Sequence, residues 1–484
     1  MRRRTATIGP AATALLLAGG LLSTTTTAGA TSDPRPLAGP TVARLAPGAW
    51  QQVSTEKVQN FTEPGTFLTA DGVLHVAWGT TRPPAAPGEP YTDAIVHRSV
   101  LPSGGLGAET DVVAGLSYGT AIPEVTGRPG GIRVYVSALK ATSPPERDAS
   151  GIFAYGSDLS GASWTEEGTA STSDGDFAAT TFDDGTPMIA GLFLSGGAWR
   201  TGFGEHPASG TISSPAFGAM EPQLARSGAT VVVGFQSFGD ATTAGIGVQQ
   251  LLPTPGPPVQ APGSCVGYHF QGPGMATRAD GTIWAAYPTK ASAGAPLLLW
   301  QVGSRTTTTV PGSERATWFD LGAGPDGRLW LVWGESDGTI RMTRTATSGT
   351  RFGAVTAWRP PADLGGDYGM TIEPAASWAD VLLIAETSAT VTSRVWHTRM
   401  LPGLDLSASP SRWRARRAQR VRVRVTDAGI GVRSVRVRGG GASCRTDRAG
   451  RCTLRFAPRR PGRVNLRATA AGWVADSVVL RVKR

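Results

Sequence analysis

The 484-residue sequence predicts an all-β protein, with a seven-bladed β-propeller followed by a small β-sandwich. Three observations predict it. A unit of strand, turn and strand recurs along most of the chain, no apolar segment follows the 3.6-residue period of a helix, and the composition changes abruptly after Leu406. The 64 Gly and 36 Pro residues also indicate many tight turns.

The recurring unit is clearest at residues 324–345, GPDGRLWLVWGESDGTIRMTRT, where Asp-Gly turns flank a short apolar strand. Successive copies are separated by 59, 54, 43, 53, 46 and 53 residues. Their first turn residues are Asp71, Gly130, Asp184, Ser227, Asp280, Asp326 and Ala379. A period of about 50 residues built only of short strands is typical of a radial propeller. Six blades remain the alternative, because the copies at Gly130 and Ala379 are the weakest.

Residues 1–30 have the pattern of a signal peptide. Three arginines precede a short apolar stretch, and small residues lead to a cleavage site after Ala30. The apolar stretch is too short and too rich in Gly and Thr for a membrane anchor. We therefore expect a secreted or cell-surface-associated protein, with no transmembrane segment in the mature chain.

The expected propeller covers residues 49–406, after a flexible lead-in over residues 31–48 that is rich in Pro, Ala and Gly. The strand near residues 50–58 is the candidate to pair with the last blade and close the ring. Tryptophans on regular strands, such as Trp78, Trp330 and Trp333, are expected to pack between blades. Trp199, Trp318 and Trp358 lie in less regular segments, where they could face a ligand.

Acidic residues recur at a fixed place in the repeat. In six of the seven copies a carboxylate lies six or eight positions before the first turn residue: Glu63, Glu124, Asp176, Glu221, Asp320 and Glu373. Both offsets are even, and an even offset along a strand returns a side chain to the same face. The pattern predicts a ring of carboxylates at one mouth of the central channel, near the start of each innermost strand.

Three interpretations of this acidic ring remain open. The carboxylates could accept hydrogen bonds from backbone amides where each blade begins, which would be a structural role. They could bind a cation or a basic ligand. Two of them could form the carboxylate pair of a glycoside hydrolase. The pattern follows the repeat in every copy but one, which favours the structural role.

A resemblance to sialidase-type propellers accompanies the strand pattern. The segment SDLSGASW resembles the Asp-box of that family at Ser157, Gly161, Ser163 and Trp164, but Leu159 stands at the aspartate position. The resemblance implies a propeller of this type. It carries no catalytic residue across, because the family's early Arg-Ile-Pro motif is missing and none of its arginine triad can be located by motif.

Other candidates for chemistry are weaker. The five histidines are His75, His97, His206, His269 and His397, and they lack the spacing of metal ligands. Cys265 stands four residues before His269, a spacing that allows a nucleophile with a base, although a buried or stray thiol is the simpler interpretation. Residues 173–176 and 336–338 are better interpreted as turns than as calcium loops. We expect no metal and no cofactor.

After Leu406 the chain alternates Val or Leu with Arg, which predicts half-buried strands over residues 407–484. Cys444 and Cys452 face each other across the predicted hairpin CRTDRAGRC, and an exported chain enters an oxidising compartment, so we expect a disulfide. The order of these strands resembles bacterial immunoglobulin-like or carboxypeptidase-regulatory-like domains. That resemblance implies a spacer or surface-adhesion role.

Charge separates the two parts. Residues 411–484 hold 21 Lys or Arg and 3 Asp or Glu, a net charge of +18. The rest of the chain has a net charge of −8, or −11 without the three signal-peptide arginines. The basic tail suggests attachment to a polyanion, either an extracellular glycan or an acidic envelope polymer. Arginine-rich composition on a solvated face and docking of the tail on the propeller are the alternatives.

Two functions follow from these observations. The first, which we prefer, is a non-catalytic extracellular binding or adhesion protein, expected to be a monomer, with a ligand face on the propeller and a basic tail. The second is a sialidase-like glycoside hydrolase or another glycan-active enzyme. A nucleic-acid partner is not expected, because the tail has no nucleic-acid motif and few aromatic residues for stacking.

Overall fold

The computed structural model describes residues 48–484 except for 59–62, 85, 88, 120–122, 141–148, 172–175, 196–197, 205–209, 212–219, 238–244, 265–271, 291–294, 362–368 and 388–391. They belong to one compact unit, Ala43–Arg484. Every regular element in this described part is a strand, which confirms the all-β prediction. Within the same residues there is no helix of the length and hydrophobicity needed to cross a membrane.

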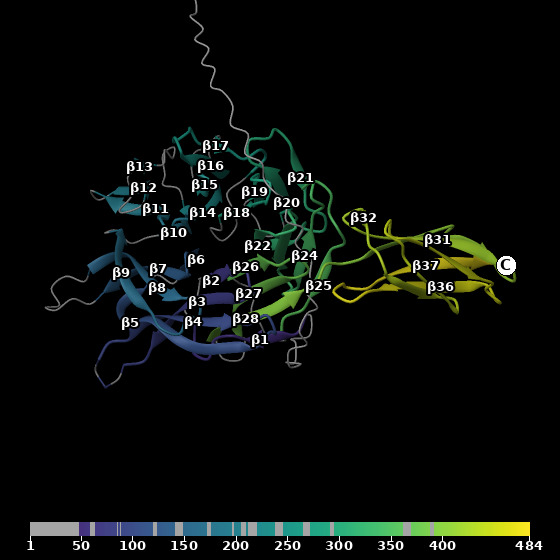
Figure 1. The fold of residues 1–484 in the computed structure, drawn as a ribbon, viewed down its shortest axis with the longest axis horizontal. Helices are drawn as coiled ribbons and strands as arrows, with labels where there is room; N and C mark the ends of the chain where they lie inside the picture. Colours follow the sequence, from purple (N-terminus) through teal and green to yellow (C-terminus); the bar gives the residue numbers. More distant parts are fainter. Residues whose placement is uncertain are drawn as a thin grey trace, which may run out of the picture. The chain divides into compact units, whose positions relative to one another are not determined.

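Within the described ranges, the strands from β1 to β28 divide into seven groups of four, of which the first two are joined into one eight-stranded sheet by the pairing of β5 with β7 (Figure 1). The first three groups are β2 (Gly65–Leu68), β3 (Leu74–Arg82), β4 (Thr92–Val100) and β5 (Leu106–Gly119); β6 (Glu124–Arg128), β7 (Gly131–Lys140), β8 (Ala149–Asp158) and β9 (Thr165–Ser171); and β10 (Phe177–Thr181), β11 (Pro187–Ser195), β12 (Ala198–Gly204) and β13 (Gly210–Thr211). The next two are β14 (Met220–Ser227), β15 (Thr230–Ser237), β16 (Gly245–Leu252) and β17 (Val259–Gln260); and β18 (Gly274–Thr277), β19 (Ile283–Pro288), β20 (Leu297–Gln301) and β21 (Thr307–Thr309). The last two are β22 (Ala316–Ala323), β23 (Leu329–Glu335), β24 (Ile340–Arg344) and β25 (Thr356–Trp358); and β26 (Gly369–Pro374), β27 (Ala379–Thr387), β28 (Thr392–Met400) and β1 (Trp50–Gln52).

The first strands of these groups contact one another in a closed ring, in the order β2, β6, β10, β14, β18, β22, β26 and back to β2. Figure 1 shows them gathered around the middle, with the fourth strands toward the rim. The amino-terminal strand β1 completes the last group by pairing with β28, Trp50 opposite Thr398, as the sequence predicted. A closed ring of four-stranded sheets is the architecture of a β-propeller.

The core lies between neighbouring sheets, and the second strand of each group explains why. In β23, Leu329, Leu331 and Trp333 pack toward the β18–β21 sheet. Their alternates Trp330 and Val332 pack toward the β26–β28 sheet. Because side chains alternate across a strand, a strand buried on both faces is apolar at every position. The continuous LWLVW run is therefore a consequence of the ring.

The predicted turn dipeptides form the turns between first and second strands. Gly327 adopts a φ of +76°, a conformation that glycine tolerates without a steric penalty. The Asp326 side chain accepts a hydrogen bond from the Arg328 amide at 3.2 Å. This local bond explains why Asp precedes Gly in these turns.

The carboxyl-terminal region forms two further sheets around one core. One sheet contains β29 (Asp405–Ser409), β31 (Gln419–Asp427), β32 (Ile430–Gly431) and β35 (Arg451–Phe456); the other contains β30 (Arg412–Arg414), β37 (Asp476–Lys483), β36 (Gly462–Thr469), β33 (Arg436–Gly439) and β34 (Ala442–Arg445). Trp413 is buried between them, and the inward valines of β31 pack on it. The predicted disulfide joins Cys444 and Cys452.

A buried ion pair connects this region to the propeller. Asp427, only 2% exposed, accepts hydrogen bonds from Arg344 at 2.7 and 3.0 Å and also binds Arg328. The Arg344 guanidinium lies over the rings of Trp330 and Trp473, at 4.7 and 5.0 Å from their centroids. Removing one member of such a buried pair leaves an uncompensated charge in the interior.

Candidate functional site

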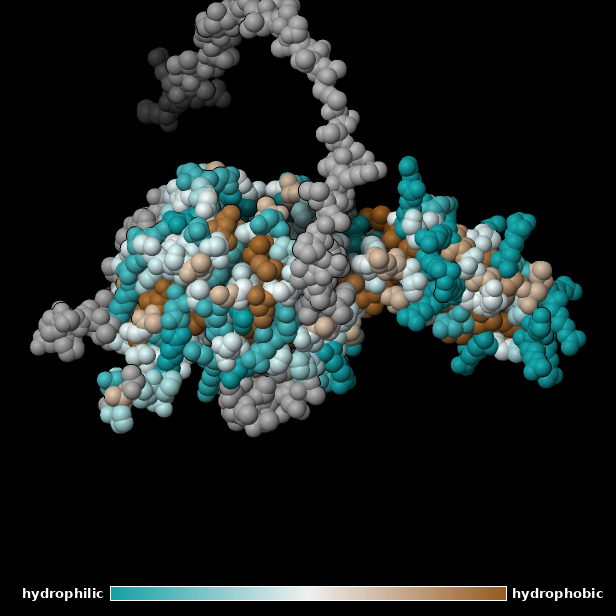
Figure 2. All heavy atoms as spheres, turned by 60° about the horizontal axis from the view of Figure 1, so that its bottom comes forward, coloured by the Kyte–Doolittle hydropathy of each residue, from teal (hydrophilic) through white to brown (hydrophobic). Residues whose placement is uncertain are grey.

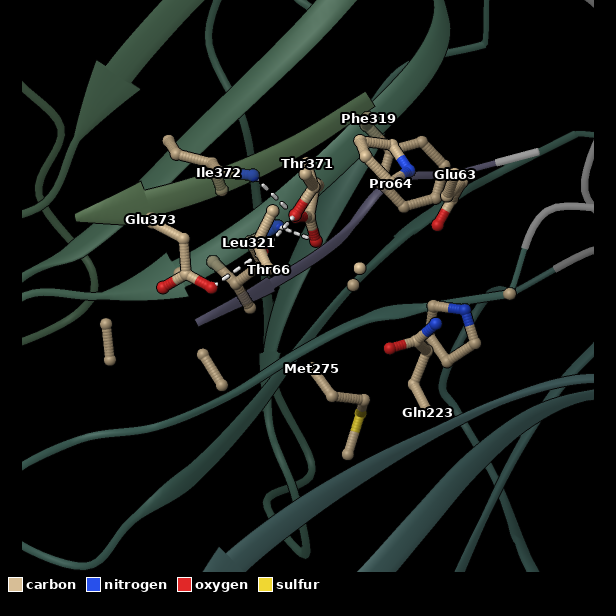
Figure 3. Close-up of a pocket in the computed structure, with 18 of the residues that line it drawn as sticks. Glu63, Pro64, Thr66, Gln223, Met275, Phe319, Leu321, Thr371, Ile372 and Glu373 are labelled. Atoms are coloured by element: carbon tan, nitrogen blue, oxygen red, sulfur yellow. Dashed lines mark hydrogen bonds between the residues drawn. The ribbon is translucent and has the colours of Figure 1, made fainter. Parts of the chain in front are cut away.

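A cavity of about 320 Å³ lies among the first strands of the propeller, where it is lined by residues of β2, β6, β14, β18, β22 and β26 (Figure 3). Five of the six predicted acidic residues line it: Glu63, Glu124, Glu221, Asp320 and Glu373. Among the described residues that form its wall there is no Lys, Arg or His. The cavity is therefore a concentration of carboxyl groups without a basic counterpart in its wall.

The inner strands place these carboxyl groups through local backbone features. Glu63 lies two residues before β2, and Glu124 is the first residue of β6. Glu221 lies at a register shift in the pairing of β14 with β15 and has a φ of +49°. A residue other than glycine with positive φ is uncommon, and such strained positions cluster at functional sites. The backbone at Glu221 is held in this conformation by the surrounding sheet.

Two carboxylates lie further along their strands than the sequence predicted. Asp320 is in the middle of β22, after a register shift between Ala316 and Phe319, and Glu373 is the last but one residue of β26. The expectation that all acids lie near the strand starts was wrong for these two. The repeat specifies the distance from the acid to the turn, whereas the start of each strand depends on where pairing begins.

Hydrogen bonding divides the acids into two kinds. Asp320 accepts hydrogen bonds from the backbone amides of Leu321 at 2.7 Å and Ile372 at 2.9 Å, and Glu373 accepts one from the Thr66 hydroxyl at 2.8 Å (Figure 3). The side chains of Glu63 and Glu124 receive no hydrogen bond from any residue within the described ranges. Asp320 therefore accepts the backbone hydrogen bonds that the structural interpretation of the acidic ring requires. Within the described ranges, Glu63 and Glu124 do not.

The pKa values follow this division. Burial, together with the charges of Asp320 and Glu124, raises the pKa of Glu63 to about 8. Burial and the charge of Asp320 also raise the pKa of Glu124 to about 8. Burial raises the pKa of Asp320 only to about 6, because the two backbone amides stabilise its ionised form. At neutral pH the cavity thus combines protonated glutamic acids with an ionised aspartate.

Glu373 and Glu221 follow the same causes. Burial raises the pKa of Glu373 to about 7, and its hydrogen bond from Thr66 opposes the rise. Burial and the charges of Asp176 and Glu63 raise the pKa of Glu221 well above its ordinary value. Asp176 does not line the cavity, but it accepts a backbone hydrogen bond from Glu221. The sixth acid is thus linked to the cavity through the backbone amide of Glu221.

The β18–β21 blade has no acid at the repeated position, and glycines line the cavity there instead. Gly272 and Gly274 line the cavity ahead of the β18–β19 turn. A Cβ atom on Gly272 would lie 2.1 Å from the carbonyl oxygen of Glu221, so only glycine fits there. The close approach of this strand to Glu221 therefore requires glycine at position 272. The spacing of the acids along the sequence could not reveal this contact.

Sequence reasoning also missed the uncharged residues of the wall. Thr66 and Gln223 present polar side chains, while Met275 and Phe319 add apolar surface (Figure 3). None of them belongs to a recurring motif. The one available signal is position, because each lies within four residues of a ring acid or of a glycine in the equivalent place.

The remaining sequence candidates lie elsewhere. His75 and His97 are buried and share a hydrogen bond of 3.0 Å, and His397 is buried against Asp380 at 2.8 Å. Cys265, His206 and His269 lie outside the described residues, as do residues 173–175. Among the residues that are described, no cluster of three or more His, Cys, Asp or Glu side chains is suited to a metal ion.

The Asp-box-like segment and two of the tryptophans noted in the sequence form turn and packing contacts away from the cavity. The segment SDLSGASW forms the turn between β8 and β9, where Asp158 accepts a hydrogen bond from the Ser160 amide at 2.9 Å. Trp164 packs edge-on against His97. Trp318 and Trp358 pack at the edge of the core between the β22–β25 and β26–β28 sheets. Neither tryptophan lines the cavity.

Comparisons with known proteins give no family. No family model matches the sequence, and no curated protein matches it. Among solved structures the chain is similar to the polysaccharide lyase Uly1, with a TM-score of 0.44 and 9% identity over 76% of this chain and 94% of the lyase. It is also similar to a GH43 enzyme from Xanthomonas citri in complex with xylotriose, with a TM-score of 0.34 and 12% identity over 75% and 91%. A third is the Aleuria aurantia lectin with a bound fucoside, with a TM-score of 0.37 and 12% identity over 63% and 99%. Similarities this distant carry no argument about function.

Proposed function

We propose that the chain is an extracellular binding protein whose propeller cavity takes a hydroxyl-rich ligand that carries a positive charge, such as a glycan residue with a free amino group. The observation that carries this proposal is the set of five carboxyl groups around one cavity whose wall contains no described basic side chain. A cation from outside the chain would supply the missing charge.

The chemistry of the cavity matches such a ligand in two ways. An ammonium group close to Glu63 and Glu124 would favour their ionised forms and form charge-assisted hydrogen bonds. Protonated carboxyl groups donate hydrogen bonds and the ionised Asp320 accepts them, as hydroxyl groups of a sugar require. A volume of about 320 Å³ lies at the lower end of the roughly 300–1,000 Å³ range of small-molecule pockets.

A glycoside hydrolase is the second candidate, and one observation favours it. Glu63 has a pKa of about 8 and Asp320 a pKa of about 6, so at neutral pH one is a protonated acid and the other an ionised carboxylate. Glycosidases use two such carboxyl groups, one protonated and one ionised. Binding remains the preferred proposal because Glu63 and Glu124 share the same raised pKa and no single residue is set apart as the acid.

Outside the cavity, the proposed function also concerns the domains, the location and the partners of the chain. We propose a secreted or surface-associated monomer with a signal peptide over residues 1–30, a lead-in over 31–48, a sialidase-type propeller over 49–406 and a basic immunoglobulin-like domain over 407–484. Its partners would be an extracellular glycan or an acidic envelope polymer, not a nucleic acid. The charge difference between the two parts supports attachment through the tail.

The test compares two oligosaccharides of equal length, glucosamine with free amines and N-acetylglucosamine without them. Isothermal titration calorimetry in two buffers of different ionisation enthalpy measures affinity and the protons released, and chromatography follows any product. The Glu63→Gln, Glu124→Gln double variant is compared with Glu89→Gln, which changes an exposed glutamate in a loop.

We expect binding of the free amine only, with proton release, and a loss of about 10- to 100-fold in affinity in the double variant. Equal binding of both oligosaccharides, or equal behaviour of both variants, would remove the cavity as a cation site. Released sugar that disappears in Asp320→Asn would instead establish the hydrolase.

A further inference from the structure

One outer face of the carboxyl-terminal sandwich carries a regular array of arginines. In β31 the buried residues Val421, Val423 and Val425 alternate with exposed arginines, so the arginines all point away from the core. The neighbouring strand β35 adds two more exposed arginines on the same face. We call this set the arginine face: Arg420, Arg422, Arg424, Arg451 and Arg455.

The strand register arranges the arginine face in rows. Arg424 lies opposite Arg451, and Arg420 lies opposite Arg455. The middle row places Arg422 between Thr453 and Ser409 of β29. Neighbouring strands are about 4.8 Å apart and alternate residues on a strand about 7 Å apart. The face therefore has paired arginines in its two outer rows, and a middle row in which one arginine lies between two hydroxyl groups.

These arginines keep their charge available. Within the described residues, none of the five forms an ion pair with a carboxylate. Arg424 donates one hydrogen bond, at 3.3 Å, to the carbonyl of Gly429. Asp447, which lines the same depression as three of these arginines, uses one carboxylate oxygen to accept bonds from the amides of Ala449 and Arg451, at 2.9 Å each. The five arginines outnumber this acid, so the face has a net positive charge.

The same face is hollowed. A depression of about 540 Å³ is lined by Arg422, Arg424 and Arg451 together with the hydroxyl groups of Ser407, Ser409 and Thr453. Figure 2 shows hydrophilic side chains projecting from this region of the chain. A guanidinium presents a planar fork of donors that matches a carboxylate, and the hydroxyl groups can bind neutral oxygens between the charges.

We propose that the arginine face binds an acidic polysaccharide, a linear chain that presents carboxylates and hydroxyl groups in alternation. The arginine pairs of the outer rows, separated by a row with two hydroxyl groups, favour this partner. Single-stranded nucleic acid needs aromatic surfaces for its bases. The exposed large hydrophobic residues of this region, Ile430 and Val479, are aliphatic. This inference rests on the proposed attachment through the basic tail and names its partner. The site shares no residue with the propeller cavity, so either can fail alone.

The opposite sheet supplies a matched control. It exposes Arg438 on β33 and Arg463 and Arg467 on β36, with Arg438 opposite Arg467. One variant of the full chain changes Arg422, Arg424 and Arg451 to Gln; the other changes Arg438, Arg463 and Arg467 to Gln. Both lose three positive charges, and the thermal unfolding midpoint of each shows whether it remains folded.

Binding is measured with fluorescent alginate oligosaccharides at several salt concentrations, beside inorganic polyphosphate and a single-stranded oligonucleotide. We expect the first variant to bind alginate about 10- to 100-fold more weakly and the control less than about 3-fold, with affinity falling as salt rises. Equal losses in both variants would show that net charge alone drives binding and would overturn the proposal. Tighter binding of the oligonucleotide or of polyphosphate than of alginate would overturn the assignment of the partner.

Discussion

Replacing Glu63 with Gln should flatten the dependence of propeller stability on pH. The pKa of Glu63 is raised from an ordinary value of 4.5 to about 8 in the folded protein. An acid whose pKa is raised by folding stabilises the folded state fully below its unfolded pKa. That stabilisation is lost as pH rises from about 4.5 through about 8. The wild-type propeller, assayed without added ligand, is therefore expected to be more stable at pH 5 than at pH 8.

The magnitude follows from linkage. Within this window one proton difference between the unfolded and folded states changes the free energy of unfolding by about 1.4 kcal/mol per pH unit. From pH 5 to pH 8 a single group with the pKa of Glu63 therefore contributes a loss on the order of 3 kcal/mol. Gln cannot ionise, so Glu63→Gln removes this contribution.

The assay is urea unfolding between pH 5 and pH 8, followed by tryptophan fluorescence. Twelve of the 14 tryptophans precede residue 405, so the signal reports mainly on the propeller. Glu89→Gln, in an exposed loop, serves as the control for loss of a carboxylate outside the cavity. We expect the two variants to diverge most at pH 8.

Parallel pH profiles for wild type and Glu63→Gln would refute the argument, because they would mean that Glu63 titrates alike in the folded and unfolded states. A larger stability at pH 8 than at pH 5 in both wild type and Glu89→Gln would also contradict it. Either result would leave the cavity with a fully ionised glutamate that another group neutralises.

Three further predictions concern the frame around the site. Asp427→Asn leaves the buried Arg344 without its partner and should cost about 3–5 kcal/mol, measured as a lower unfolding midpoint; an unchanged midpoint would show that the pair is not buried in solution. Replacing Cys444 and Cys452 by Ser should cost about 2–3 kcal/mol, seen as equal midpoints for the variant and for the reduced wild type. Gly272→Ala should destabilise the propeller by more than about 1 kcal/mol, because its Cβ would collide with a backbone carbonyl; a neutral effect would mean that the inner strands can separate.

The repeat made the propeller predictable from sequence. Asp-Gly turns and apolar second strands recur because each blade must meet two neighbours, and LWLVW in β23 shows both buried faces in one run. The same logic predicted that a strand near Trp50 would close the ring, and β1 pairs with β28. The alternation of Val and Arg predicted the half-buried strands of the carboxyl-terminal region, and the hairpin predicted its disulfide.

The candidate site was predictable only as a set of acids. Even spacing from each turn identified the carboxylates, since spacing along a strand is a local property. Whether they are tied to the backbone is not local. The partner amide of Ile372 belongs to β26, 52 residues from Asp320, and the sequence left that structural role equally open for every acid.

The sequence by itself therefore determined the repeat, the strand periodicity, the acids and the basic tail, because each of these depends on residues close together in the chain. The tertiary structure alone decided that five carboxyl groups share one cavity, with no basic side chain among the described residues of its wall. It also decided that Asp320 accepts hydrogen bonds from backbone amides while Glu63 and Glu124 receive none from the described part of the chain, and that arginines of β31 and β35 share one face. The physical reason is that burial and charge interaction depend on distances in space, which arise only when strands far apart in sequence pair and the ring closes.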